Sequence, residues 1–154
     1  MIEEPKDPRI EDDELIIETL DTTESYNGNY LVAALLVFVA RGDGNISDAE
    51  TAAMIDLVKA HRRLSSSETL ALLTRVTEDI ASNPDFNSLL KDLAPLLSVA
   101  EKEEAALMML KVAAADGRRD TEEIAKVRIA AELIDIPPDI LHRAYDRYFE
   151  ETQV

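Results

Sequence analysis

One motif occurs twice in this chain, and it constrains the fold more than any other feature. Asp43-Gly44 recurs as Asp116-Gly117, a shift of 73 residues, and at the same shift Ser47 falls on Asp120 and Glu50 on Glu123. Asp-Gly ends a helix, and a Ser or Asp followed three residues later by Glu caps the next one. The sequence therefore predicts two helix–Asp-Gly loop–helix units that pack as a pseudo-two-fold pair.

The helices that follow the two loops share one apolar pattern. In both units apolar residues recur at i, i+3, i+4 and i+7, which indicates one buried helix face. The aligned positions are Met54, Leu57, Val58 and His61 in the first unit, and Val127, Ala130, Ala131 and Ile134 in the second. Since His61 aligns with an isoleucine, we interpret it as a packed or boundary histidine rather than a ligand.

The remainder of the chain from Tyr30 onward is also predicted to be helical. Valine and isoleucine never alternate with polar residues there, as a half-buried strand requires. The predicted helices cover about 30–41, 47–63, 65–82, 83–95, 99–115, 120–134 and 139–150. At 154 residues and 46% hydrophobic content, the fold class predicted is all-α, a compact bundle of seven to eight helices.

The first 28 residues differ from the rest in charge. They carry ten acids against two bases and are interpreted as an acidic arm, with a helical domain over 29–154. The composition favours a solvated arm. The stretch from Asp13 to Leu20 has the pattern of a short amphipathic helix, and Asn27-Gly28-Asn29 is expected to break the chain after it.

Charge and composition limit the partners. A formal net charge of −16 without a basic stripe makes nucleic acid and anionic membranes poor partners, so no nucleic acid is expected, and it favours cations and a protein partner with a basic surface. The longest apolar run has 11 residues, from Tyr30 to Ala40, whereas a membrane span needs about 20, so no transmembrane segment is expected. The acidic start and the absence of cysteine favour a cytoplasmic location.

The polar residues of the Asp-Gly loops allow two interpretations. As caps and helix terminators, they need no ligand. As oxygen donors, they suit Ca²⁺ or Mg²⁺. The candidate metal ligands are Asp43, Asn45, Ser47, Glu50, Asp116, Asp120 and Glu123. One loop alone lacks the first ligands of an EF-hand, because Val39 and Arg41 occupy those positions, so a cation site must take ligands from elsewhere.

The chain contains no motif for catalysis. It has no Gly-rich phosphate loop, no His-Glu-x-x-His run and no nucleophile elbow, and Ser65-Ser66-Ser67 is interpreted as a helix start. The protein is therefore expected not to be an enzyme.

The paired loops resemble the tellurite-resistance TerB family over about residues 29–150. The residues that match are Ala115-Asp116-Gly117 with Asp120 and Glu123, and Arg41-Gly42-Asp43-Gly44 with Ser47 and Glu50. Gly42 departs from the small apolar residue of that pattern, and Arg41 places a cation beside the first loop.

The resemblance implies a compact bundle of about seven helices, a cytoplasmic location, no established catalysis, and a divalent-metal site formed by the loop acids in proteins linked to tellurite and chemical stress. Two functional hypotheses follow: a non-enzymatic stress-response domain that binds a cation, or an acidic adaptor module whose Asp-Gly loops are purely structural.

Overall fold

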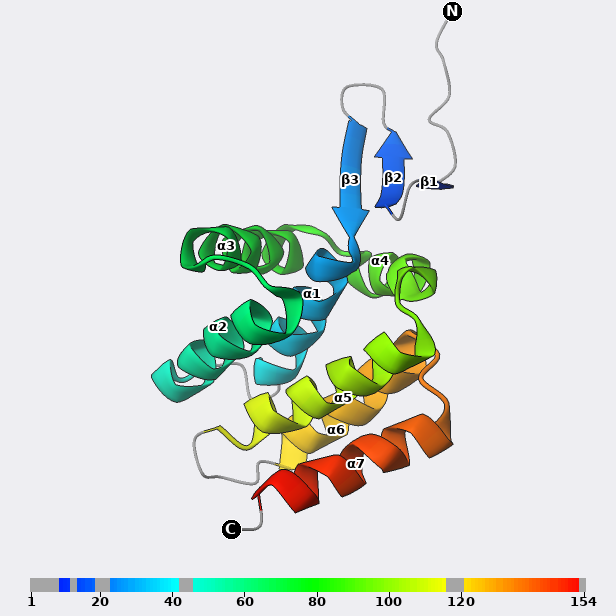
Figure 1. The fold of residues 1–154 in the computed structure, drawn as a ribbon. Helices are drawn as coiled ribbons and strands as arrows, with labels where there is room; N and C mark the ends of the chain where they lie inside the picture. The colour runs from blue at the N-terminus through cyan, green and yellow to red at the C-terminus, as the bar shows by residue number, and fades with distance from the viewer. Residues whose placement is uncertain (1–8, 12–13, 19–22, 42–45, 116–120, 153–154) are drawn as a thin grey trace, which may run out of the picture.

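The structure is a computed structural model that describes residues 9–11, 14–18, 23–41, 46–115 and 121–152. Its helices form a bundle, and a small sheet projects from one end (Figure 1). The helices are α1 (Gly28–Ala40), α2 (Asp48–Arg62), α3 (Ser66–Ser82), α4 (Phe86–Leu93), α5 (Val99–Ala113), α6 (Thr121–Leu133) and α7 (Pro138–Thr152), with a 3₁₀ turn, η1 (Ala94–Leu96). The predicted all-α bundle is confirmed. The pseudo-two-fold packing of its units stays a prediction, because both Asp-Gly loops lie outside the described residues.

Helix α1 is the centre of the bundle. From Tyr30 to Ala40 every residue except Phe38 is buried, and α1 contacts α2, α3, α4, α5 and α6. A helix that is apolar on all sides must be covered on all sides, and this explains why the other helices surround it. In the described part of the chain, no helix combines the length and the apolar character needed to cross a membrane.

The predicted capping boxes at Ser47 and Ser65 are present. In each, the serine hydroxyl accepts a hydrogen bond from the backbone N–H of the glutamate three residues on, and the glutamate carboxylate accepts one from the serine N–H. A third box, which was not predicted, opens α5. The serine–glutamate pairs are Ser47–Glu50, Ser65–Glu68 and Ser98–Glu101, with distances of 3.1 to 3.2 Å.

The short helix expected from Asp13 to Leu20 is wrong. The described part of that stretch is strand β2 (Glu14–Glu18), which pairs antiparallel with β1 (Arg9–Glu11) and β3 (Thr23–Asn27). Leu15 and its register partner Tyr26 are buried at 2% and 6% exposure. Because a strand directs alternate residues to one face, five residues suffice to turn Leu15 inward, and the two β-branched isoleucines that follow favour the extended backbone.

The predicted helix start at Asn83-Pro84 is also misplaced, since α4 begins at Phe86. Asn83 instead ends α3: its N–H donates to the carbonyl of Asp79 at 2.8 Å. Its side-chain oxygen accepts a hydrogen bond from the N–H of Asp85 at 2.9 Å. The Asn side chain therefore caps a turn between two helices rather than the helix that follows.

The sheet is fixed to the bundle by a tyrosine–arginine anchor, which consists of Tyr26, Tyr30, Arg75 and Asp79. The guanidinium carbon of Arg75 lies 4.6 and 4.8 Å from the ring centroids of Tyr26 and Tyr30. The Tyr30 hydroxyl donates to Asp79 Oδ2 at 2.6 Å, and Arg75 Nη2 donates to the carbonyl of Ser25 at 3.0 Å. Burial is the main cause that raises the pKa of Tyr30, and the hydrogen bond to Asp79 is the second. The Tyr30 hydroxyl therefore keeps its proton and remains the donor to Asp79.

The predicted chain break at Asn27-Gly28-Asn29 is instead the junction between the sheet and α1. Asn27 ends β3 and is the N-cap of the helix: its side-chain oxygen accepts a hydrogen bond from the N–H of Tyr30 at 3.0 Å. An Asn N-cap supplies one of the acceptors that the first helical turn lacks. The strand therefore leads directly into the central helix.

Candidate functional site

Two of the seven predicted metal ligands, Ser47 and Glu50, have described side chains. Both lie at the start of α2, directly after the first Asp-Gly loop. Glu123 belongs to α6, but its side chain lies outside the described residues. The other four also lie outside them: Asp43, Asn45, Asp116 and Asp120. Whether the two loops converge on one space stays a prediction.

Glu50 is more deeply buried than its capping role requires. It is 1% exposed, and its Oε1 accepts the hydrogen bond from the N–H of Ser47. Its second oxygen, Oε2, is buried and has no hydrogen-bond partner among the described residues. A buried carboxylate oxygen without a partner is costly and rare in native proteins. The cap therefore accounts for one oxygen of Glu50 and leaves the other unexplained.

The other two capping boxes provide an internal comparison. Glu68 and Glu101 make the same reciprocal hydrogen bonds as Glu50, but Glu68 is exposed and the Glu101 side chain is 39% exposed. Water can therefore reach the carboxylates of both. Of these three capping boxes, only Ser47–Glu50, which follows an Asp-Gly loop, has a buried glutamate.

The helices that flank the two loops meet at one place. The ammonium of Lys126, on α6 after the second loop, lies 4.8 Å from the ring centroid of Phe38, on α1 before the first. Helix α1 also contacts α5 and α6. The C-terminal ends of α1 and α5 and the N-terminal ends of α2 and α6 lie toward the same lower-left part of the bundle in Figure 1.

The described residues alone do not form a complete cation site. Among them, no group of three or more His, Asp or Glu side chains could hold a metal ion. What they do contain is a buried carboxylate oxygen, Oε2 of Glu50, that has no hydrogen-bond partner among them. Hard oxygen donors of this kind fit Ca²⁺ or Mg²⁺, with the remaining ligands to come from the loops.

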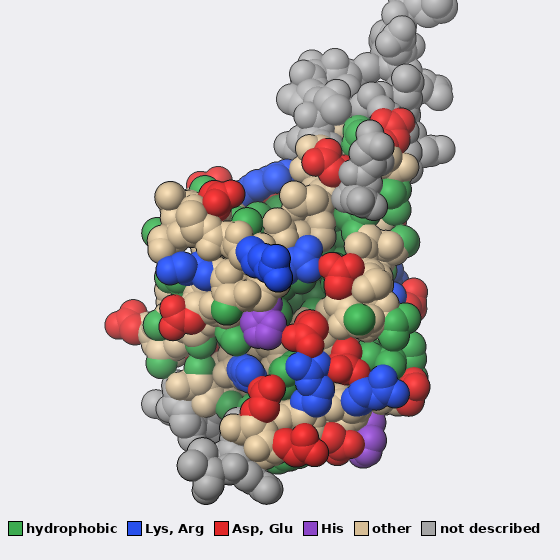
Figure 2. Space-filling view, in the orientation of Figure 1, with side chains coloured by type: hydrophobic (Ala, Val, Ile, Leu, Met, Phe, Trp, Pro, Cys, Tyr) green, Lys and Arg blue, Asp and Glu red, His purple; other side chains and the backbone are tan. Residues whose placement is uncertain are grey.

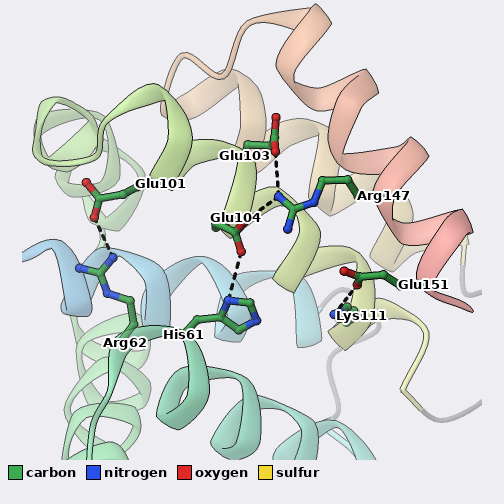
Figure 3. Close-up of polar contacts among 8 residues, drawn as sticks. All are labelled: His61, Arg62, Glu101, Glu103, Glu104, Lys111, Arg147 and Glu151. Atoms are coloured by element: carbon green, nitrogen blue, oxygen red, sulfur yellow. Dashed lines mark hydrogen bonds and ion pairs between the residues drawn. The ribbon is translucent and has the colours of Figure 1, made fainter.

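A second polar group of residues lies on α2, α5 and α7 (Figure 3). Glu104 on α5 accepts from Arg147 at 2.6 Å and pairs with His61 Nδ1 at 3.1 Å. Glu103 also binds Arg147, at 2.7 Å. With 27% of its side chain exposed, His61 is the boundary histidine that the sequence predicts. Its partner, Glu104, could not be predicted, since residues 43 positions apart share no local pattern.

The same face carries further ion pairs, which join α5 to its neighbours. Arg62 donates to Asn29 Oδ1 at 2.6 Å and to Glu101 Oε2 at 2.8 Å, and Lys111 binds Glu151 at 2.7 Å. Figure 2 shows basic and acidic side chains next to one another on the face of the bundle turned toward the viewer. Since each described acid here already has a basic partner, we interpret the group as a structural link between three helices.

Glu101 makes stability depend on pH. The hydrogen bond from Arg62 holds the pKa of its carboxyl below the usual range, with a smaller contribution from the N–H of Ser98. A lowered folded-state pKa stabilises the fold above the unfolded pKa of about 4.3, and this stabilisation is lost as pH falls through the folded-state value. Glu101→Gln, which keeps an acceptor for the cap, is expected to lower stability at pH 7 by less than about 1 kcal/mol.

The measurement for Glu101→Gln is urea unfolding at pH 7, 5, 4 and 3. The difference between this variant and the unmodified protein should shrink toward zero below about pH 4. Glu132→Gln, at an exposed position on α6, is the control and should change nothing. A difference that stays constant down to pH 3 would contradict the assignment to the Arg62 contact.

The profile of the family described as tellurite resistance protein TerB matches residues 29–146. A search of curated proteins and a search of solved structures each found no match. The matched segment begins within α1, ends within α7 and includes both Asp-Gly loops, whereas β1, β2 and β3 precede it. Since it covers well over half of the 154 residues, the chain belongs to the TerB family.

Proposed function

We propose that this TerB-family domain binds a divalent cation, Ca²⁺ or Mg²⁺, through the acids of its two Asp-Gly loops, and that it acts in a cytoplasmic stress response without catalysing a reaction. The observation that carries the proposal is the buried Oε2 of Glu50, which has no partner among the described residues. A cation would compensate the charge of this carboxylate and supply the missing contact.

The number of ligands supports a site shared by both loops. Ca²⁺ takes about six to eight oxygen ligands, and Mg²⁺ about six, some of which are waters. Besides Glu50, the first loop offers the side-chain oxygens of Asp43 and Asn45. The Phe38–Lys126 contact joins the helices that flank the two loops, which favours a contribution from Asp116 of the second loop.

A thermal melt with and without cation tests this function. In 5 mM CaCl₂ or MgCl₂ the melting temperature should be higher than in chelator, because a ligand that binds only the folded state stabilises it. The double variant Asp43→Asn with Asp116→Asn should lose most of that rise. Its control is Asp56→Asn with Asp139→Asn, two exposed acids outside the loops. An unchanged melting temperature at millimolar cation rejects the proposal.

A second candidate function is an adaptor that binds a protein with a basic surface, with the Asp-Gly loops purely structural. It is supported by the net charge of −16 and by an exposed apolar side chain, Leu70 on α3, which is 51% exposed. The two functions differ in one respect: partner binding by the adaptor should survive the double loop variant, whereas cation binding should not.

A further inference from the structure

An apolar groove of about 330 Å³ lies between α2 and α3. Its apolar lining consists of Val37, Ile46, Met54, Ile55, Leu70 and Leu73. An apolar cavity of roughly 150 Å³ accepts a benzene-sized group. The groove therefore has room for about two large apolar side chains.

Leu70 distinguishes this groove from ordinary surface. Single exposed apolar side chains are common and need no explanation. Leu70, however, is 51% exposed and stands beside a concave apolar floor, to which Met54 and Leu73 contribute at 3% and 8% exposure. A partner side chain seated here would bury the exposed part of Leu70 as well as its own apolar surface.

The charge around the groove indicates which charge a partner should carry. Helices α2 and α3 carry six acids against three bases, and Glu78 is part of the groove lining. The one base on α3, Arg75, lies over the rings of Tyr26 and Tyr30. No described basic side chain pairs with Glu78, so a basic group on the partner would meet an uncompensated acid.

We propose that this groove docks an amphipathic helix of a partner protein, which inserts two large apolar side chains at i and i+4 and places Lys or Arg near Glu78. Side chains with this spacing lie about 5–6 Å apart on one helix face, which suits a groove between two helices. A second copy of this chain is the weaker occupant, because two chains of charge −16 repel each other. The inference is independent of cation binding.

The test uses the full chain in buffer with chelator, so that it does not depend on a cation. The probe is a labelled, helix-forming peptide with leucines at i and i+4 and lysines on the flanking positions, measured by fluorescence anisotropy. We expect saturable binding that Leu70→Asp weakens at least tenfold and Glu78→Lys about fivefold. A peptide with glutamate in place of lysine should bind at least tenfold more weakly.

The matched controls are Ile129→Asp and Glu132→Lys on α6. Ile129 is 42% exposed, so it gives the same change of chemistry at a comparable surface position away from the groove, and both controls should bind the lysine peptide normally. The proposal is overturned if the peptide does not bind at millimolar concentration, if Leu70→Asp and Ile129→Asp act alike, or if both peptides bind equally. It is also overturned if sedimentation shows that Leu70→Asp dissociates a dimer, since the occupant is then a second copy.

Discussion

Glu50→Gln is expected to reverse the order of stability between chelator and saturating cation. Without a cation, the free energy of unfolding of the variant should equal that of the unmodified protein or exceed it by up to about 1 kcal/mol. The reason is that the amide oxygen still accepts from Ser47 and no buried charge remains. At a cation concentration 100 times the dissociation constant, the unmodified protein should gain about 2.7 kcal/mol. The variant should gain little of this.

Urea unfolding in chelator and in 5 mM CaCl₂ or MgCl₂ measures this reversal. Glu68→Gln is the matched control, since Glu68 has the same place in a capping box but is exposed, and its stability should rise in cation as much as that of the unmodified protein. Two results would contradict the role given to Glu50. One is an equal gain from cation in both proteins, and the other is a large loss of stability of the variant in chelator, which would show that protein groups hold the carboxylate.

The helical part of the fold could be predicted because its signals are local. The run from Tyr30 to Ala40 is apolar on every side, and burial on all sides is the only arrangement that removes such a helix from water. The serine–glutamate spacing at Ser47 and Ser65 sets helix starts within four residues of chain. In both cases the residues that determine the structure are close together in the sequence.

The sheet could not be predicted, because its stability comes from distant residues. Glu14 to Glu18 has an amphipathic pattern that suits a helix or a strand over so few residues. Contacts with α3 favour the strand: Arg75 donates to the Ser25 carbonyl of β3, and Asp79 accepts from Tyr30 just after it, each from about 50 positions away. Prediction of the candidate site has the same limit. The acids could be identified from their spacing, but the burial of Glu50 depends on how α2 packs.

A protein that begins at Asn27 is expected to be less stable than the full chain by about 2–4 kcal/mol. Asn27 is kept because it caps α1. Deletion of the sheet removes two buried side chains, Leu15 and Tyr26, each worth about 1.5–3 kcal/mol, and the ring contacts with Tyr30 and Arg75. The entropy recovered when the strands are no longer ordered offsets part of this loss.

Charge repulsion has the opposite effect on stability, because removing an acidic segment relieves it. The size of this effect relative to the lost burial distinguishes a sheet that packs on the bundle from a solvated acidic arm. The deleted residues carry ten acids against two bases, so their removal lowers the repulsion within the protein. At 0.15 M salt this repulsion is screened beyond about 8 Å, and we expect the lost burial to dominate. A truncated protein as stable as the full chain would instead support the solvated arm that composition alone favours.

Single substitutions separate burial from charge in the same segment. Leu15→Ala should cost about 2–3 kcal/mol because its site is buried. Ile10→Ala should cost only a few tenths, because Ile10, which pairs with Leu15 across the sheet, is 45% exposed. Neither substitution alters the charge, so a large loss for Leu15 alone means that β2 is part of the domain core. Equal, small losses would mean that the sheet contributes no packing to the bundle and that the stable domain begins at α1.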